Sequence, residues 1–176
     1  MKADLQSSGT NTNDAFGDVY ISIENLRGSG LKDTLNGNDL ANRIDGLAGG
    51  DTINGRGGDD TLAGGAGKDK LTGGTGADRF EFASTAAADA DTISDFAGGT
   101  DEIELDSDVF GLAEGALPAG RFVIGTAAAD ASDRLVYNSA NGQLFFDADG
   151  TGAQAQVLIA TLTGAPVIAA TDFLVI

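Results

Sequence analysis

Aspartate side chains recur at intervals of nine residues through the middle of this chain. The column reads Asp33, Asn42, Asp51, Asp60, Asp69 and Asp78. Carboxylate and amide oxygens are hard ligands, and Ca²⁺ takes six to eight oxygens at about 2.3–2.6 Å. One side chain in nine residues cannot fill such a shell. The spacing therefore predicts that each ion lies between two stacked turns and also takes backbone carbonyl oxygens.

Two further columns share this period and indicate which elements position the acidic side chains. A glycine stands five residues before each column member and a large apolar residue stands two residues after it. The glycines are Gly28, Gly37, Gly46, Gly55, Gly64 and Gly73, followed in the last four units by Gly49, Gly58, Gly67 and Gly76 at the fourth position. The apolar residues are Leu35, Ile44, Ile53, Leu62, Leu71 and Phe80. Because glycine reaches backbone conformations closed to other residues, each unit is predicted to be a tight turn. A short strand with its apolar side chain inward follows each turn.

The most regular units, Gly64–Thr72 and Gly73–Glu81, resemble the calcium-binding repeats of the RTX (repeats-in-toxin) family. The resemblance implies an all-β fold, a right-handed parallel β-roll in which two nonapeptides make one circuit. Turns on the same side then lie 18 residues apart. The expected stacks are Asp33, Asp51 and Asp69 on one side, and Asn42, Asp60 and Asp78 on the other.

The same resemblance implies the remaining calcium ligands, because family members use carbonyls from positions one to four of two stacked turns. For the ion between Asp51 and Asp69 these are Leu47, Gly49, Gly64 and Ala66. For the ion between Asp60 and Asp78 these are Arg56, Gly58, Gly73 and Thr75. The other candidate carbonyls are those of Gly46, Ala48, Gly55, Gly57, Gly65, Gly67, Gly74 and Gly76. Six repeats imply about four Ca²⁺ ions between turns, with further ions open at the ends of the roll.

The first two repeats depart from this pattern. Leu31 and Leu40 stand where later repeats have glycine, and Asn42 supplies one neutral oxygen in place of a carboxylate, so its site is expected to be weaker. Before the repeats, residues 19–26 alternate apolar and polar side chains and are predicted to form a leading cap strand. The chain is accordingly divided into a cap at 1–27, the repeats at 28–81 and an acidic C-terminal cap at 82–176.

The region after the repeats is predicted to close the roll. Phe80–Phe82 is expected to be its final strand, and residues 89–108 then hold eight acids and no base. This stretch resembles the region after the repeats in RTX exoproteases, which lends carboxylates to the last turns. Asp95 or Asp101 is the candidate to stand over Gly65, Gly67 and Asp69, which lack a following repeat. The alternative is a solvated acidic face.

The C-terminal cap is predicted to contain antiparallel β-hairpins. Residues 134–137 and 143–146 are apolar segments on either side of Asn141-Gly142, a dipeptide that favours tight hairpin turns, and 155–160 is a further strand. Asp147 and Asp149 are spaced as at the start of an EF-hand loop. Position twelve of that loop is Leu158 where the EF-hand needs a bidentate Glu, so a plain turn is favoured.

Composition excludes several classes of function. The chain has 27 acidic and 10 basic residues and a formal charge of −17, which disfavours nucleic acids and anionic membrane surfaces. It contains no His and no Cys, which removes thiolate sites and His-based catalysis. No apolar run reaches the length of a membrane span. Gly67-Lys68-Asp69 lacks the hydroxyl residue of a P-loop, and no enzyme is predicted.

These observations predict a calcium-binding RTX module that is secreted and folds on meeting extracellular Ca²⁺. The last residues, 172–176, resemble the C-terminal signal of proteins exported by type I secretion machinery, although an ordinary last strand explains them too. An upstream domain of a larger parent protein is then expected. The alternative function is a carbohydrate- or surface-binding module. An acidic polysaccharide would be repelled by this chain unless Ca²⁺ bridges the two.

Overall fold

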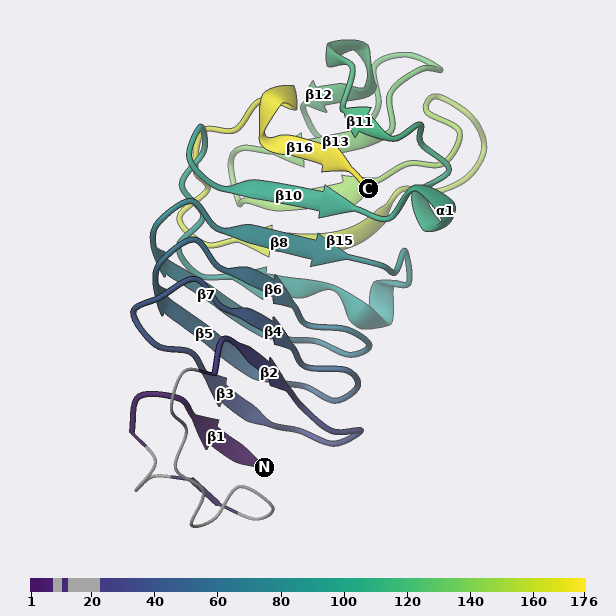
Figure 1. Cartoon of the computed structure of the whole chain (residues 1–176). Coiled ribbons are helices and arrows are strands. Elements are labelled where there is room, and N and C mark those ends of the chain that lie inside the picture. The colour runs from purple at the N-terminus through teal and green to yellow at the C-terminus, as the bar shows by residue number, and fades with distance from the viewer. Residues whose placement is uncertain (8–10, 13–22) are drawn as a thin grey trace.

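The nonapeptide period becomes two facing stacks of short parallel strands (Figure 1). The computed structural model describes residues 1–7, 11–12 and 23–176. One stack holds β3 (Thr34–Asn36), β5 (Thr52–Gly57) and β7 (Lys70–Thr75). The other holds β2 (Asn25–Arg27), β4 (Arg43–Asp45), β6 (Thr61–Ala63) and β8 (Arg79–Phe82).

Strand register follows the sequence period. Thr34 lies opposite Thr52 and Thr52 opposite Lys70, an offset of 18 residues at each step. The second stack repeats that offset from Arg43 to Thr61 and from Thr61 to Arg79. The parallel β-roll and its all-β class, predicted from the repeats, are confirmed.

Both sheets continue beyond the repeats without a break. β9 (Asp91–Ile93) pairs in parallel with β7, and β10 (Glu102–Leu105) pairs in parallel with β8. The expectation that Phe80–Phe82 forms the final strand of the roll is therefore wrong. The C-terminal strands β15 (Val157–Leu162) and β16 (Phe173–Val175) then pair in parallel with β9 and β10.

The far end of the molecule is antiparallel. β13 (Leu135–Asn138) and β14 (Gln143–Phe146) form the hairpin that was predicted around Asn141-Gly142. β15 pairs antiparallel with β14 and begins two residues later than the predicted 155–160 strand. The remaining elements are β11 (Gly115–Ala116), β12 (Phe122–Ile124), the helix α1 (Ser107–Phe110) and the 3₁₀ turns η3 (Ala87–Asp89), η4 (Ala119–Arg121) and η5 (Ala170–Asp172). Among the described residues, no helix has the length and apolar character needed to cross a bilayer.

The N-terminal end is closed differently from the prediction. β1 (Lys2–Asp4) adds an outer parallel strand beside β3. Of the predicted leading strand at 19–26, residues 19–22 lie outside the described residues. Its last part belongs to β2, where Leu26 is 8% exposed and pairs with Ile44 of β4.

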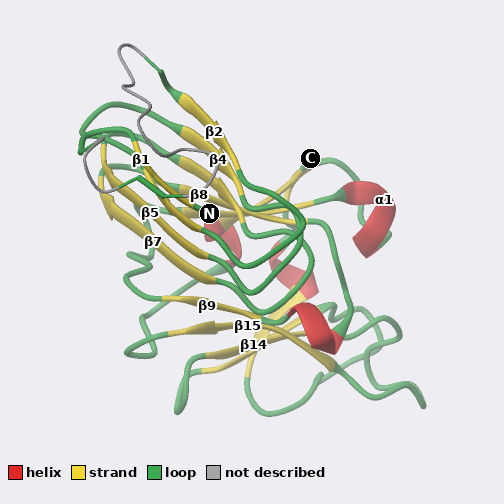
Figure 2. Cartoon of the chain, turned by 90° about the horizontal axis from the view of Figure 1, so that it is seen from below, coloured by secondary structure: helices red, strands yellow, loops and turns green. Residues whose placement is uncertain are grey.

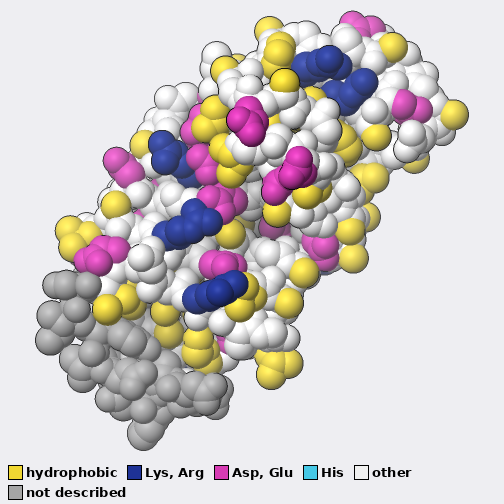
Figure 3. All heavy atoms as spheres, turned by 45° about the vertical axis from the view of Figure 1, so that its right-hand side comes forward, with side chains coloured by type: hydrophobic (Ala, Val, Ile, Leu, Met, Phe, Trp, Pro, Cys, Tyr) yellow, Lys and Arg dark blue, Asp and Glu magenta, His cyan; other side chains and the backbone are white. Residues whose placement is uncertain are grey.

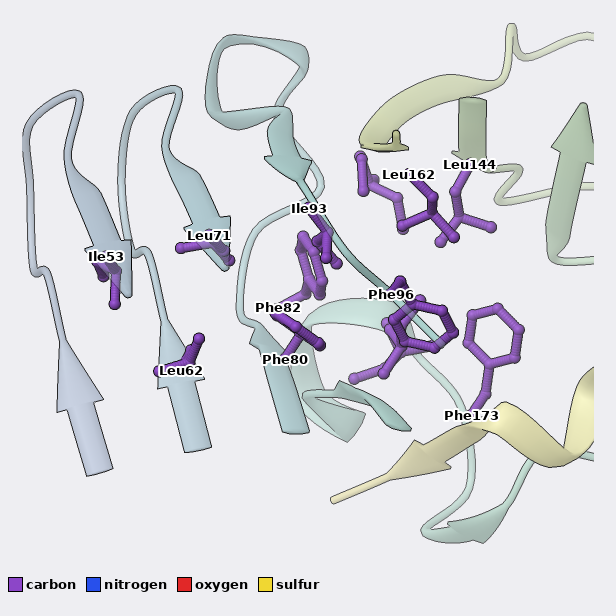
Figure 4. Packing of buried hydrophobic residues seen from close by; sticks show 14 of the residues in the cluster. Ile53, Leu62, Leu71, Phe80, Phe82, Ile93, Phe96, Leu144, Leu162 and Phe173 are labelled. Atoms are coloured by element: carbon purple, nitrogen blue, oxygen red, sulfur yellow. The ribbon is translucent and has the colours of Figure 1, made fainter. Parts of the chain in front are cut away.

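The core lies between the two sheets and follows the apolar column. Leu35, Ile53, Leu71 and Ile93 point inward from one sheet against Ile44, Leu62, Phe80 and Ile103 of the other, and all eight are fully buried. Figure 4 shows part of this ladder running into the cap, where Leu144, Leu162 and Phe173 join it. Burial of each such side chain contributes about 1.5–3 kcal/mol. Figure 2, which views the chain from below, shows the loops that link the strands at the edges of the roll.

Candidate metal centre

The sixth-position side chains form two buried ladders, one along each edge of the roll. All six are at most 4% exposed. On one edge the backbone N–H of Asp33 donates to Oδ1 of Asp51, and the N–H of Asp51 donates to Oδ1 of Asp69, at 2.7 and 2.6 Å. On the other edge Asn42 donates to Asp60 and Asp60 to Asp78, at 2.7 and 3.0 Å. The structure thus brings together the partners that the 18-residue spacing predicts.

The second carboxylate oxygen of four ladder residues has no hydrogen-bond donor. Oδ2 of Asp51, Asp60, Asp69 and Asp78 is buried and unpartnered. Burying an ionised oxygen without a partner is costly, so the charge is either neutralised by a proton or compensated by a cation. Burial raises the pKa of Asp51 to about 6 and that of Asp60 to about 7. Burial also raises the pKa of Asp69 and of Asp78.

Backbone carbonyls face the same spaces between turns. A Cβ atom on Gly46 would lie 2.5 Å from the carbonyl oxygen of Gly64 and 2.6 Å from Oδ2 of Asp51. These two oxygens therefore share the hollow that the missing side chain of Gly46 leaves. Gly55 makes the same hollow on the other edge, with Oδ2 of Asp60 and the carbonyl of Gly73. Unpartnered carboxylate oxygens beside carbonyls are the donor set that Ca²⁺ prefers, so the residues present fit the ion.

The other carbonyls that the resemblance implies also point between layers. The carbonyls of Leu47 and Gly49 approach Gly65 and Gly67 of the next turn, and the carbonyl of Ala66 accepts from the N–H of Gly49 at 2.8 Å. On the second edge the carbonyls of Arg56 and Gly58 approach Gly74 and Gly76, while that of Thr75 faces Gly57. The carbonyls of Gly46 and Gly55 face down toward Gly28 and Gly37, and Ala48 bridges Ala66 in parallel.

Glycine has two different roles in these turns, and the spacing predicts only the conformational one. Positive φ angles occur at the second and fourth positions, at Leu47 (75°), Gly49 (146°), Gly65 (94°) and Gly67 (126°). The first-position glycines have no positive φ. They are required because a side chain there would collide with the ladder carboxylate. Leu47 and Arg56 (79°) are L-residues held in the left-handed region, which is strained without glycine.

The pairing of the late acids differs from the prediction. Asp95 does not stand over Asp69; its carboxylate accepts from the N–H groups of Gly73 and Gly74 at 3.0 and 2.9 Å. Asp101 accepts from the N–H of Asp78 at 3.1 Å. The reason is that residues 83–90 lengthen the step between layers from 18 residues to 22 on one edge and 23 on the other.

Two residues that were not among the predicted ligands lie over the Gly64–Asp69 turn. Asp91, 4% exposed, accepts from the N–H of Asp69 at 2.9 Å. Asp89 accepts from the N–H of Gly67 at 3.0 Å and from the hydroxyl of Ser84 at 2.7 Å. Burial raises the pKa of Asp91 to about 8. The tripeptide Asp91-Thr92-Ile93 repeats Asp51-Thr52-Ile53, which is the signal that identifies this layer.

In the first two turns, the ladder side-chain oxygens already accept hydrogen bonds from within the protein. Oδ2 of Asp33 accepts from the backbone N–H and the hydroxyl of Ser29, at 2.6 and 2.9 Å. The Met1 amine also contacts the Asp33 carboxylate. Burial alone would raise the pKa of Asp33, but these hydrogen bonds bring that pKa below its usual value. Oδ1 of Asn42 accepts from the N–H of Asn38 at 2.8 Å.

A metal ion in this arrangement would be bound by carboxylate oxygens together with backbone carbonyl oxygens. Within residues 1–7, 11–12 and 23–176, no three acidic side chains converge as they would in a metal site made of side chains alone. Each hollow instead joins ladder carboxylates to carbonyls of two layers. In the cap, Asp147 accepts from the N–H of Asp149 at 3.3 Å and the chain turns there.

A parallel roll with unpaired acidic oxygens between stacked glycine turns defines a class of repeat protein that binds divalent cations along its edges. A family model for the RTX calcium-binding nonapeptide repeat, in four copies, matches residues 27–62, 36–71 and 54–82. The chain belongs to this RTX family. No relative was found among curated proteins.

Two solved structures share both fold and sequence with the chain. One is the solution structure of the AlgE6R3 subunit from the Azotobacter vinelandii mannuronan C5-epimerase, 31% identical over 84% of this chain and 80% of that one, with a TM-score of 0.55. The other is the AlgE6R2 subunit of the same epimerase, 29% identical over 88% of this chain and 94% of that one, with a TM-score of 0.58. The chain is thus an RTX calcium-binding module of β-roll type.

Proposed function

We propose that this module folds when it binds calcium and belongs to a larger exported protein, where it serves as a non-catalytic, stabilising part. The observation that carries the proposal is the set of four buried, unpartnered Oδ2 atoms on Asp51, Asp60, Asp69 and Asp78. Bound Ca²⁺ supplies the positive charge that these oxygens lack. At neutral pH without a cation, the stacked carboxylates repel one another and oppose closure of the roll.

Coupling between layers follows from the shared ladder. Asp51 donates its N–H to Asp69 and accepts from Asp33, so ordering one turn orders its neighbours. Stacked repeats of this kind gain stability from nearest-neighbour contacts, which makes binding cooperative. Extracellular modules with millimolar to submillimolar affinity fill outside the cell and stay empty in the calcium-poor cytosol. Each occupied site then stabilises the fold by mass action.

The proposed export route is consistent with the C-terminal strand. Phe173 and Val175 of β16 are buried beside β10, and Asp172 is 5% exposed. These residues are accessible to secretion machinery in the unfolded chain, before Ca²⁺ closes the roll. An upstream domain in the parent protein remains part of the proposal.

Calcium is expected to switch the secondary structure of the isolated chain. Far-ultraviolet circular dichroism in EGTA should show a largely unfolded repeat region, and a cooperative β-sheet signal should appear as Ca²⁺ is added. Mg²⁺ at equal ionic strength is the control, because it separates screening of the −17 charge from coordination. Identical spectra in Ca²⁺ and EGTA would remove the proposed function.

A second candidate function, binding of an acidic polysaccharide, is favoured by one surface feature. Three exposed lysines, Lys32, Lys68 and Lys70, line a groove of about 660 Å³ together with hydroxyl groups, among them those of Thr52 and Thr92. Within the described part of the chain, none of these lysines is within ion-pair distance of a carboxylate. The structural neighbours come from an enzyme named for mannuronan, a polyuronate.

The arginines of the opposite sheet do not offer such a site. Arg43 forms a bidentate pair with Glu81, and Arg79 lies within 3.5 Å of Glu102 and Glu104. Figure 3 shows a face on which Lys and Arg side chains alternate with Asp and Glu. Paired arginines have little charge left to attract a polyanion. The lysine groove is the site that we propose for a carboxylate-bearing glycan.

Replacing the three groove lysines by glutamine is expected to weaken retention on a polymannuronate column about tenfold, with Ca²⁺ kept saturating. The matched control is the triple variant Arg27→Gln, Arg43→Gln and Arg79→Gln, which removes the same charge from the opposite sheet. Equal loss in both variants, or no retention of the parent chain, counts against this second function and leaves the calcium proposal intact.

A further inference from the structure

We propose that the calcium positions of this chain lie one layer nearer the C-terminus than its repeats indicate. The occupied layers are Asp51–Asp69, Asp60–Asp78, Asp69–Asp91 and Asp78–Asp101. The layers Asp33–Asp51 and Asn42–Asp60 hold no ion. This inference rests on the proposed calcium function and assigns two positions outside the residues that the family model matches.

The unpartnered oxygens identify the layers. Oδ2 of Asp51 shares its hollow with the carbonyl of Gly64, which belongs to the following turn. An unpartnered Oδ2 therefore marks the space between its own turn and the next. Asp69 and Asp78 are the last repeat aspartates, are 3% and 1% exposed, and carry the same unpartnered oxygen. The layers that follow Asp69 and Asp78 lie beyond the repeats, in β9 and β10.

Those further layers are built like the repeats. Ile93 lies opposite Leu71, and Ile103 lies opposite Phe80, so Asp91 and Asp101 occupy the sixth position of their layers. The N–H of Asp69 donates to Asp91 and the N–H of Asp78 donates to Asp101, at 2.9 and 3.1 Å. Both acceptors are buried, 4% and 7% exposed.

Two carboxylates replace the backbone carbonyls that a regular next turn would supply. Within the repeats, the N–H of Gly49 donates to the carbonyl of Ala66 at 2.8 Å. One layer on, the equivalent N–H of Gly67 donates to Oδ1 of Asp89 at 3.0 Å.

The second edge shows the same replacement. The N–H of Gly37, a first-position glycine on this edge, donates to the carbonyl of Asn54 at 2.8 Å. The equivalent N–H of Gly73 donates to Oδ1 of Asp95 at 3.0 Å. Oδ2 of Asp78 lies against this same Gly73. Each replacement adds a negative charge next to an unpartnered carboxylate, which a divalent cation compensates.

The N-terminal layers lack a free ligand. The oxygen of Asp33 that corresponds to the unpartnered Oδ2 accepts from the N–H and the hydroxyl of Ser29. The corresponding oxygen of Asn42 accepts from Asn38. At the fourth position, Leu31 and Leu40 do not take the positive φ that Gly49 and Gly58 have.

An arginine side chain already supplies positive charge at the N-terminal end of the second ladder. The guanidinium of Arg56 donates to the carbonyl of Gly37 at 2.7 Å and to Oδ2 of Asp4 at 2.8 Å. Gly37 is the first-position glycine of the Asn42 turn. Arg56 thus adds a positive charge at the N-terminal end of this ladder.

Calcium counting on single variants tests this shift. By equilibrium dialysis with metal analysis, the parent chain is expected to bind four ions and Asp91→Asn and Asp101→Asn three each. The matched control is Asp33→Asn, a buried sixth-position residue at the opposite end, which should retain four. Loss of an ion in Asp33→Asn with four retained in Asp91→Asn and Asp101→Asn overturns the inference, as does loss in all three from a parent count of six.

A measurement on the parent chain covers the case in which a variant does not fold. In crystals soaked with Tb³⁺ as a calcium substitute, anomalous peaks are expected beside Asp69 and Asp78, and none beside Asp33 or Asn42. Peaks in the N-terminal layers overturn the inference while leaving the calcium function standing. Absence of calcium binding by the parent chain defeats the proposed function itself.

Discussion

Gly67→Ala is expected to abolish calcium-dependent folding of the roll. A Cβ atom on Gly67 would overlap the carbonyl oxygen of Gly49 in the layer below, and this neighbour is backbone that cannot rotate away. The φ of 126° at Gly67 adds a conformation that alanine rarely adopts. Separating the two layers would also separate the carbonyls from the Asp69 carboxylate. The expected loss exceeds about 4 kcal/mol, a size restricted to changes of this kind.

Thermal unfolding in saturating Ca²⁺ measures this loss, and two other glycines separate its causes. Gly30→Ala meets no atom within 4 Å and has no positive φ, so its melting temperature should stay within error of the parent. Gly111→Ala also meets open space but has a φ of 62°, and should lose about 1 kcal/mol from backbone strain alone. If Gly67→Ala melts like Gly111→Ala, close stacking of the layers is not what the glycine protects.

The nonapeptide period carries most of the information about the roll. Gly, Asp and the apolar residue recur together, so one layer determines the next, and the 18-residue register from Thr34 to Thr52 follows directly. The same reasoning places the ladder partners Asp51 and Asp69 together, because strand pairing leaves their side chains no other layer.

The layers beyond the repeats could not be predicted in this way, because the nine-residue period is not kept there. From Asp69 to Asp91 the step is 22 residues, and from Asp78 to Asp101 it is 23. A search for acidic residues at nine-residue intervals therefore does not find Asp89 and Asp91. The local pattern of Asp91-Thr92-Ile93 is kept, because the strand still needs an inward apolar residue two positions after the acid.

Pairing between strands that are far apart in the sequence was the part of the fold that was hardest to predict. β15 and β16 return to the sheets beside β9 and β10 after intervening segments that carry no shared period. β1 pairs with β3 although residues 2–4 carry no repeat motif. Such contacts depend on the edges left open by other strands, which is a property of the assembled sheets rather than of any one segment. The hairpin around Gly142 could be predicted because its turn is formed by residues adjacent in the sequence.

Without calcium, the chain is expected to become more ordered as the pH falls from 8 to 5. Burial raises the pKa of Asp51 to about 6, that of Asp60 to about 7 and that of Asp91 to about 8, above the 3.8 of an exposed Asp. Between roughly pH 4 and 8 the folded state therefore binds more protons than the unfolded state. Stability then falls as pH rises, by about 1.4 kcal/mol per pH unit for each extra proton bound. Melting followed by circular dichroism in EGTA measures this slope.

Saturating Ca²⁺ should reverse the sign of that slope. The cation and the proton compete for the same ladder oxygens, such as Oδ2 of Asp60 and Asp78, and acid displaces the metal. The melting temperature in Ca²⁺ is therefore expected to rise between pH 5 and 8, opposite to the EGTA series. Asp91→Asn is the control, because a neutral amide at this position should flatten the EGTA slope without inverting it. Slopes of the same sign in Ca²⁺ and EGTA would mean that protons and calcium act at different places, and that the ladder carboxylates are not the metal's ligands.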